Sequence, residues 1–420
     1  MKNKNVIILS IDEVRPDHLS CYGYNKIKTK NIDSIAKEGV LFKRCITASD
    51  LTPICMSSVM CAKYPNKHGM RDPYSKIQAK TFAEVLKEKG FKTAGFVGNG
   101  LLGAEHGFGK GFDYFDQPTK DTSWKRGQYP DKKGVFYEGN WWIDKMFEWL
   151  DNNKDFQFFI WGHFYETHEG SQHSLLKRGL LEEGRLPEFG YYDAKIEMVD
   201  KVLFGPLIKK LKEFGIYENT IFVAMSDHGT CLGEHPREPL PWRGGNVVYP
   251  QHTDMHDTDI TSFLIMKDKD LPKNKKIEGM VRTVDIVPTL LELLEINVSE
   301  DFDGQSLMSF IEQGKASGLT AYSEDLFEVR GPGAVQGIRT DTYKYMRNLS
   351  RWTEEFYDLK EDPGEQNNIV ANAENKDIIK KSRVIMNEKL WKVQATYGGS
   401  FSKEKEEEIK QRLRALGYIQ

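Results

Sequence analysis

The chain has 420 residues, of which 39% are hydrophobic and 29% are charged, as is ordinary for a folded protein in water. Its formal net charge of −3 gives no general attraction to nucleic acid or to an anionic membrane, and we expect neither as a partner. Five cysteines without a Cys-x-x-Cys pair argue against a disulfide framework and a thiolate zinc site. No run approaches the ~20 apolar residues of a membrane span and no signal-peptide pattern is present, so we predict a cytoplasmic protein.

Strand-like apolar runs alternate with helical patterns over most of the chain. In chain order the expected elements are a strand at 5–11, helices near 31–38 and 80–89, a strand at 91–97, a helix near 140–151, a strand at 156–162, an amphipathic helix near 190–214 and a strand at 219–226. This alternation predicts an α/β fold, with a mostly parallel sheet sandwiched by helices. Two aromatic-rich polar loops, at 117–139 and 229–256, interrupt the pattern, and loops of this length commonly form a substrate pocket.

The pattern of expected secondary structure changes after an expected helix at Val284–Leu294. Short β-rich segments begin at residues 320, 337, 343 and 356, and charged helical stretches follow at about 373–394 and 403–415. We therefore predict a catalytic domain at 1–297 and a smaller C-terminal α+β domain at 298–420. The last, Lys/Glu-rich helix is expected to be a solvated surface element.

Acidic and imidazole side chains follow two of the predicted buried strands. Asp12 and Glu13 end the run at 5–11, and Asp227 and His228 end the run at 220–226. A single aspartate at a strand end is often only a helix N-cap, but two such ends point to a ligand site at the carboxyl edge of the sheet. Carboxylates with histidine suit a divalent cation.

The order of motifs resembles the sulfatase branch of the alkaline phosphatase superfamily over nearly the whole chain. The landmarks that carry the resemblance are the opening segment 5–24, Asn31-Ile32-Asp33, the segment 38–42, the turn 64–69, the segment 111–115, the segment 285–291 and the segment 357–365. The resemblance implies a metal-dependent ester hydrolase. Its metal ligands would be Asp12, Glu13, Asp227 and His228, with Thr52 close by. The cofactor would be one or possibly two divalent ions, Mn²⁺, Zn²⁺, Ca²⁺ or Mg²⁺.

The resemblance places the nucleophile at Thr52, counted back from Tyr64-Pro65. Sulfatases carry a Cys-x-Pro-Ser-Arg or Ser-x-Pro-Ser-Arg motif there, and its first residue is oxidised to formylglycine. In this chain Cys55 stands at the serine position and Met56 replaces the arginine, so formylglycine at Cys55 is not expected. A hydroxyl beside Pro53 at a helix N-terminus would be favoured as an alkoxide. The alternative is that Thr52 serves only as an N-cap.

The threonine bears on the substrate class. A threonine sulfate lacks the hemiacetal exit of a formylglycine sulfate, whereas water can hydrolyse a threonine phosphate. We therefore expect cleavage of phosphate or phosphonate esters through a covalent Thr52 intermediate. The alternatives are a sulfuric ester hydrolase, a phosphoryl transferase with an alcohol acceptor, and a catalytically inactive binding protein. The expected partner is a small-molecule ester, and a homo-oligomer is left open.

Two further histidine clusters match the family pattern. His163 and His168 span a His-x-x-x-x-His segment in which Glu166-Thr167 replaces the usual Asp-Pro. His168 is expected to donate to the leaving-group oxygen, and His163 either does the same or is structural. Glu166 with His168 could instead hold a second metal ion.

The other cluster is His252-Thr253-Asp254-Met255-His256-Asp257. By resemblance His252 takes the cationic position that contacts the substrate, while His256 and Asp257 fall on a Tyr-acid pair. The spacing of His252 and His256 also permits metal ligation on a helix; we favour substrate contact over ligation for His252, and the role of His256 stays open.

A few positions are of secondary interest. Arg15 falls where the family orients the metal loop, and Lys63 could compensate for the arginine lost at Met56. His68 lies in the turn at 64–69 that follows the predicted nucleophile. Asn99 follows a strand and could line the cleft. The aromatic loop from Trp124 to Trp142 is either a pocket wall or a packing surface.

Overall fold

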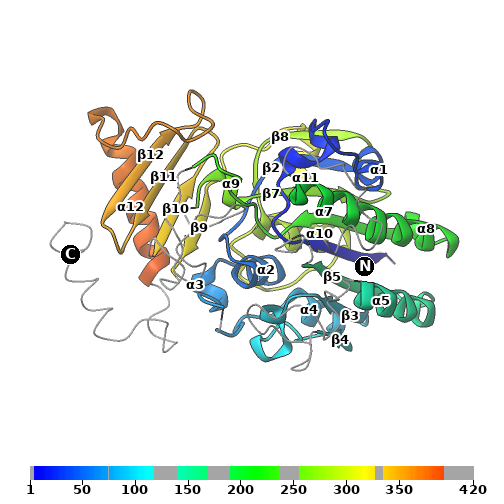
Figure 1. Cartoon of the computed structure of the whole chain (residues 1–420). Helices are drawn as coiled ribbons and strands as arrows, with labels where there is room; N and C mark the ends of the chain where they lie inside the picture. Colours follow the sequence, from blue (N-terminus) through cyan, green and yellow to red (C-terminus); the bar gives the residue numbers. More distant parts are fainter. Residues whose placement is uncertain are drawn as a thin grey trace, which may run out of the picture.

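An eight-stranded mixed sheet forms the larger part of the molecule (Figure 1), in the order β4-β3-β5-β1-β6-β7-β2-β8. The computed structural model describes residues 4–73, 75–117, 140–165, 167, 190–235, 255–326 and 334–391. The strands are β1 (Asn5–Ile11), β2 (Val40–Ile46), β3 (Lys92–Val97), β4 (Tyr114–Asp116), β5 (Phe158–Phe164), β6 (Thr220–Ser226), β7 (Thr261–Lys267) and β8 (Lys275–Arg282). The pairs from β4 to β6 and the pair β2/β8 are parallel, whereas β7 is antiparallel to both of its neighbours. The predicted mostly parallel sheet is confirmed.

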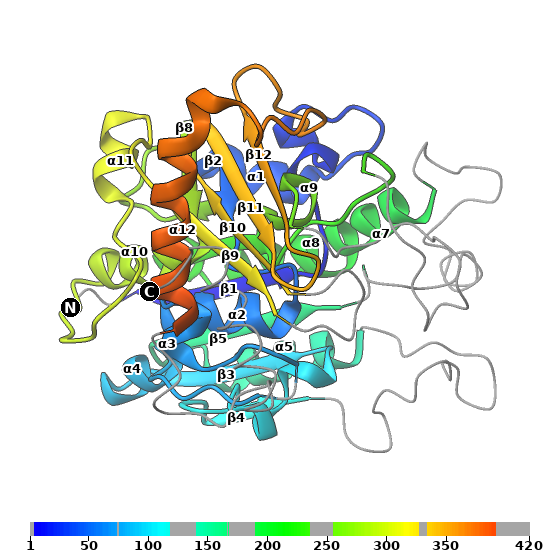
Figure 2. The ribbon, with the colours of Figure 1, turned by 90° about the vertical axis from the view of Figure 1, so that its left-hand side faces the viewer.

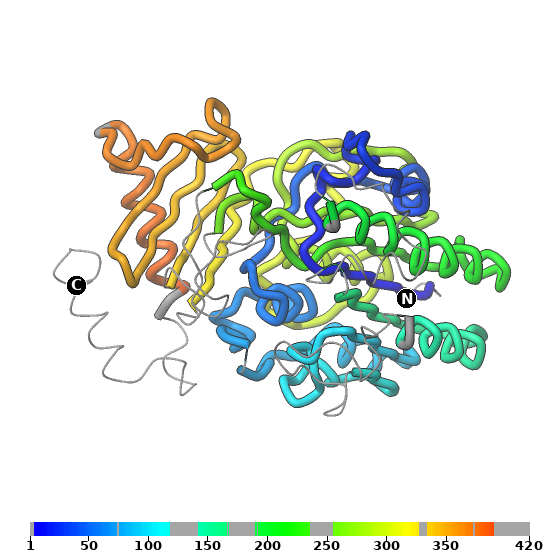
Figure 3. Tube along the Cα trace, in the orientation of Figure 1, coloured from blue at the N-terminus to red at the C-terminus, as the bar shows by residue number. Residues whose placement is uncertain are grey.

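Helices cover both faces of this sheet, which explains why β1, β5 and β6 are buried at every position. Val6 and Ile8 point into the core beneath α2 (Thr52–Cys61), α4 (Phe82–Glu88) and α10 (Ile286–Leu293). The alternate residues Ile7 and Leu9 point into the opposite core, beneath α1 (Lys30–Glu38) and α5 (Asn140–Asn153). Figure 3 shows the N-terminal strand running through the interior of this larger part.

The long helix predicted near 190–214 is interrupted. It consists of α7 (Tyr191–Val199), a π-helical turn over Asp200–Phe204 and α8 (Gly205–Glu213). Pro206, the second residue of α8, has no backbone N–H to continue the α-helical bonding, which accounts for the interruption before it. In the turn, Asp200 accepts hydrogen bonds from the amides of Asn31 and Ile32 at the start of α1.

A four-stranded antiparallel sheet forms the smaller C-terminal part, in the order β12-β11-β10-β9. Its strands are β9 (Ala321–Asp325), β10 (Val335–Arg339), β11 (Tyr343–Asn348) and β12 (Thr353–Asp358). Helix α12 (Lys376–Trp391) crosses one face of the sheet (Figure 2), where Ile379 and Met386 pack against Ile338 and Tyr345. On the other face Met346 packs against Ile46 and Met280 of the larger part.

The predicted smaller α+β unit is therefore present, while the boundary at 297/298 stays a prediction. Leu307 and Ile311, beside and within α11 (Met308–Gln313), belong to the core of the large sheet. The stretch expected to be helical at 403–415 lies outside the described residues. Within the described segments, no helix combines the length and the apolar character that a bilayer crossing requires.

Candidate metal centre and active site

The ends of three neighbouring strands bring the acidic residues together. Strand β1 lies between β5 and β6, with Ile11 in register with Phe164 on one side and Ser226 on the other. The ladder continues one residue further, because the Asp12 amide donates to the Phe164 carbonyl at 2.9 Å and the Asp227 amide donates to the Ile11 carbonyl at 3.3 Å. Asp12 and Asp227 therefore emerge at the same edge of the sheet.

Asp12, Asp227 and His228 form a compact buried group, with one potential ligand atom from each within 4.8 Å of the others. Nδ1 of His228 lies 2.7 Å from the Gly229 carbonyl oxygen, so Nδ1 carries the proton and Nε2 keeps a lone pair. Nε2 lies 3.4 Å from Oδ2 of Asp227. Oδ1 of Asp227 accepts hydrogen bonds from the amides of Glu13 and His228, while its buried Oδ2 accepts none among the described residues.

This donor set fits a divalent cation. Two carboxylates held close together in a buried pocket repel each other unless a positive charge lies between them. The lone pair of His228 faces the same space, and carboxylate oxygens with one imidazole are suitable ligands.

Thr52 is the first residue of α2, and its hydroxyl faces this group. Oγ1 lies 3.4 Å from Oδ2 of Asp12 and 3.3 Å from Nε2 of His228. Leu51 is the N-cap of the helix, so the alternative reading of Thr52 as the cap is wrong. The hydroxyl lies at the positive end of a helix dipole and beside the candidate cation site.

Two residues that follow Thr52 are enclosed by the protein. The Cys55 thiol donates to the Ser49 carbonyl oxygen at 2.9 Å, and burial raises its pKa well above the usual value. A buried, protonated thiol is inert. Met56 is fully buried in the core on the α2 side of the sheet, where the family carries an arginine.

His163 projects from β5 next to the metal group. Its Nε2 lies 3.5 Å from Oδ2 of Asp12, and its Nδ1 lies 2.8 Å from Oγ of Ser10. The ring is fully buried, and burial lowers the pKa of His163 to about 4. This neutral imidazole therefore lies beside the Asp12 carboxylate, and its predicted role, catalytic or structural, stays a prediction.

Three predicted site residues, Glu166, His168 and His252, lie outside the described residues, and so does most of the aromatic loop. Their predicted roles stay predictions.

Glu13 and Arg15 shape the loop after β1. Glu13 has a left-handed backbone, with φ of 60°, and its carbonyl accepts a hydrogen bond from the Tyr192 hydroxyl. Its carboxylate is not one of the three grouped ligands, so its role as a ligand stays a prediction. Arg15 binds Asp17, Glu234 and the Thr230 carbonyl, and thereby joins the loops that follow β1 and β6.

His68 and Asn99 have structural partners. Nε2 of His68 lies 2.9 Å from Oγ of Ser58, its Nδ1 accepts the Met70 amide, and burial lowers its pKa to about 3. The Asn99 side chain accepts the Leu101 amide and so caps a short 3-10 helix. The predicted compensation by Lys63 for the arginine lost at Met56 stays a prediction.

Lys195 of α7 was not among the predicted site residues. Its Nζ donates to the Thr167 carbonyl at 3.0 Å, and the Thr167 hydroxyl donates to the Asp12 carbonyl at 2.6 Å. Burial lowers the pKa of Lys195 to about 8, although Glu13 and Asp12 favour its charge. The sequence signal that could have identified Lys195 is its position between Tyr192, Ile196 and Val199, hydrophobic residues that are all buried in the structure.

This fold and this site define an enzyme of the α/β class with a buried group at the carboxyl edge of its sheet that could hold a divalent cation. The chain belongs to the sulfatase family of the alkaline phosphatase superfamily: residues 4–296 match the sulfatase family model, and residues 249–396 match the model of the N-sulphoglucosamine sulphohydrolase C-terminal region. The predicted family is thereby confirmed.

Individual relatives agree with this assignment. An N-acetylglucosamine-6-O-sulfatase of Bacteroides thetaiotaomicron is 24% identical, over 96% of this chain and 88% of the relative. An arylsulfatase of Clostridium perfringens is 24% identical, over 92% of this chain and 94% of the relative.

Among solved structures, a protein in complex with its substrate D-glucosamine-2-N,6-O-disulfate has a TM-score of 0.73 at 20% identity, covering 94% of this chain and 99% of that one. The phosphonate monoester hydrolase of Agrobacterium radiobacter has a TM-score of 0.69 at 19% identity, covering 93% and 95%. These likenesses confirm the fold.

Proposed function

We propose that the protein hydrolyses sulfate esters of a small organic molecule at the centre formed by Asp12, Asp227, His228 and Thr52. The observation that carries the proposal is the Thr52 hydroxyl, which faces both Asp12 and His228 from the start of α2. Relatives that match most of the chain are named as sulfatases, which supports sulfate over the phosphate and phosphonate esters expected from the sequence.

In the proposed reaction, the Thr52 hydroxyl loses its proton to solvent, and Oγ1 attacks the sulfur atom while the bond from sulfur to the ester oxygen breaks. The alcohol leaves with a proton, for which His168 is the predicted donor. Water then attacks the sulfur of the threonine sulfate, releasing sulfate and restoring the hydroxyl. A divalent cation held by Asp12, Asp227 and His228 would lower the pKa of the hydroxyl and offset charge on the ester oxygens.

Phosphate or phosphonate ester hydrolysis is the second candidate, and one observation favours it. Thr52 stands where sulfatases carry the residue that becomes formylglycine, and Cys55 is a buried thiol one turn further along the helix. A phosphoryl group on threonine is open to hydrolysis by water, and the fold is shared with a phosphonate monoester hydrolase.

A substrate panel separates the two candidates. We would measure kcat/KM for para-nitrophenyl sulfate, para-nitrophenyl phosphate, bis-para-nitrophenyl phosphate and a para-nitrophenyl phosphonate, each with Ca²⁺, Mg²⁺, Mn²⁺ or Zn²⁺. Sulfate should be the best substrate if the proposal holds, and a reversed ranking would establish the second candidate. Adding glycerol or ethanolamine and searching for a phosphorylated or sulfated acceptor tests for a transferase.

A further inference from the structure

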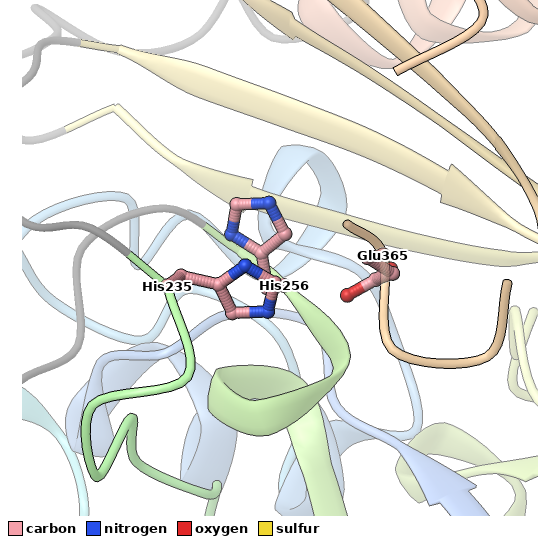
Figure 4. A group of neighbouring side chains, drawn as sticks. All are labelled: His235, His256 and Glu365. Carbon is pink, nitrogen blue, oxygen red and sulfur yellow. The ribbon is translucent and has the colours of Figure 1, made fainter. Parts of the chain in front are cut away.

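A second group of buried potential ligands lies where the smaller sheet meets the larger part. His235 follows β6, His256 precedes α9 (Asp257–Ile260), and Glu365 follows β12. One ligand atom from each residue lies within 4.8 Å of the others, and the three residues are 5%, 6% and 3% exposed. Figure 4 shows the two imidazole rings together and the Glu365 carboxylate directed toward them.

The backbone and neighbouring charges hold this group in place. Glu365 has a left-handed backbone, with φ of 55°, and its Oε2 accepts the Asp257 amide at 2.7 Å. Its Oε1 pairs with Lys344 at 2.8 Å, and Lys344 also pairs with Asp257, which in turn binds Arg339. Each carboxylate oxygen of Glu365 keeps a second lone pair, so these contacts leave it able to bind a metal.

The surroundings of His256 determine which of its two ring nitrogens keeps a lone pair for a metal ion. Nε2 lies 3.4 Å from Oε2 of Glu355 and 3.5 Å from the Tyr357 hydroxyl. A carboxylate on Nε2 holds the proton there, and the buried Nδ1, which has no hydrogen-bond partner among the described residues, keeps its lone pair. A carboxylate on the far nitrogen is the usual support of a metal-binding histidine.

We propose that His235, His256 and Glu365 bind a zinc-class transition-metal ion that joins the smaller sheet to the larger part. Two imidazoles and one carboxylate suit Zn²⁺, with water available as a fourth ligand. By contrast, the Asp12 group offers two carboxylates and one imidazole, a harder donor set.

Binding requires a small local movement. The rings of His235 and His256 are stacked, with centroids 3.8 Å apart and an interplanar angle of 13°. Zinc–nitrogen bonds of about 2.0–2.1 Å lie in the ring planes, so the rings must tilt to share one ion. The ion would tie the loop that follows β6 and the start of α9 to the loop after β12.

The test is a count of metal ions in the full chain. Wild-type protein and a His256→Gln variant are stripped with a chelator, dialysed against Zn²⁺, and analysed by elemental mass spectrometry. The wild type should retain one more zinc ion per chain than the variant. Cobalt in place of zinc should give visible absorption bands that the variant loses, because a low-symmetry nitrogen-ligated site makes these bands intense. Equal zinc counts and equal cobalt spectra would overturn the proposal.

Two further variants complete the design. His106→Gln removes a partly exposed histidine from a different part of the fold and should keep the full zinc count, which excludes general binding by histidines. If circular dichroism shows that His256→Gln does not fold, His235→Gln gives the same test, and an undiminished count in that variant overturns the proposal. These measurements need no substrate, so they are independent of the proposed hydrolysis.

Discussion

The amide of Gly229 donates to the carbonyl oxygen of Asp259 at 2.8 Å, which joins the turn after His228 to the helix after His256. The two candidate metal groups are thus connected through a backbone hydrogen bond. A Cβ atom at Gly229 would lie 2.2 Å from the carbonyl oxygen of Thr258 in the same helix. Only glycine permits this close approach.

Gly229→Ala should therefore destabilise the fold by about 1–3 kcal/mol or more, because backbone must move to admit the methyl group. Urea unfolding would measure the change in the free energy of unfolding. Gly100→Ala is the matched control, since a Cβ there meets no atom within 4 Å. Equal stability of the two variants would show that the close approach is unimportant.

Thr52→Ala should reduce turnover by several orders of magnitude, because the nucleophile and its stabilised alkoxide are lost together. The cost in stability should be small, about 1 kcal/mol, for the loss of one buried methyl group and a hydroxyl. Steady-state rates and thermal unfolding would measure both effects. Thr52→Ser keeps the hydroxyl and should retain most of the activity, and near-normal turnover by the alanine variant would point to water as the nucleophile.

Asp227→Asn should weaken divalent-cation binding at the Asp12 group by about 100-fold or more, since a charged ligand becomes neutral while the amide oxygen still accepts the Glu13 and His228 amides. Isothermal titration of chelator-treated protein measures the affinity, and activity at low metal concentration should fall in parallel. Asp17→Asn on the adjacent loop makes the same charge change at an exposed side chain. That variant should bind the cation like the wild type.

His68 should make the protein sensitive to acid. Its pKa is lowered to about 3 by burial, so between about pH 6.5 and pH 3 the unfolded chain binds a proton that the folded chain excludes. The free energy of unfolding should fall by up to about 1.4 kcal/mol for each pH unit in this window from this group. Urea unfolding at several pH values would show a shallower dependence for His68→Gln, and an unchanged slope would contradict the assignment.

The sheet and the convergence of Asp12 with Asp227 could be predicted from the sequence, because both follow from the positions of the apolar strand-like runs. Asp12 and Asp227 follow uniformly apolar runs, and parallel strands bring such ends to one edge. Strand β2 was not predicted as a strand because Lys43 and Arg44 interrupt its apolar pattern at a β-bulge. The π-helical turn at Asp200–Phe204 leaves the helical periodicity nearly intact, so it gave no sequence signal.

The second candidate metal group, His235, His256 and Glu365, was not predicted as a group. His256 had been singled out and Glu365 belonged to a family landmark, but His235 carried no local signal. Glu365 meets the amide of Asp257 across 108 residues of sequence, and only the packing of the smaller sheet makes that contact. Lys195 likewise reaches Asp12 through Thr167, a tertiary relation that its own helix pattern does not reveal.

The position of the Asp12 centre between β5, β1 and β6 has a consequence for folding kinetics. Its supporting contacts span long stretches of chain, 152 residues from Ser10 to Gly162 and 214 from Glu13 to Asp227. Contacts of such high sequence separation carry a large loop-closure cost and form slowly. The centre can exist only after β1 has paired with both β5 and β6. A cation bound there would therefore mainly lower the rate of unfolding and would have little influence on the early steps of folding.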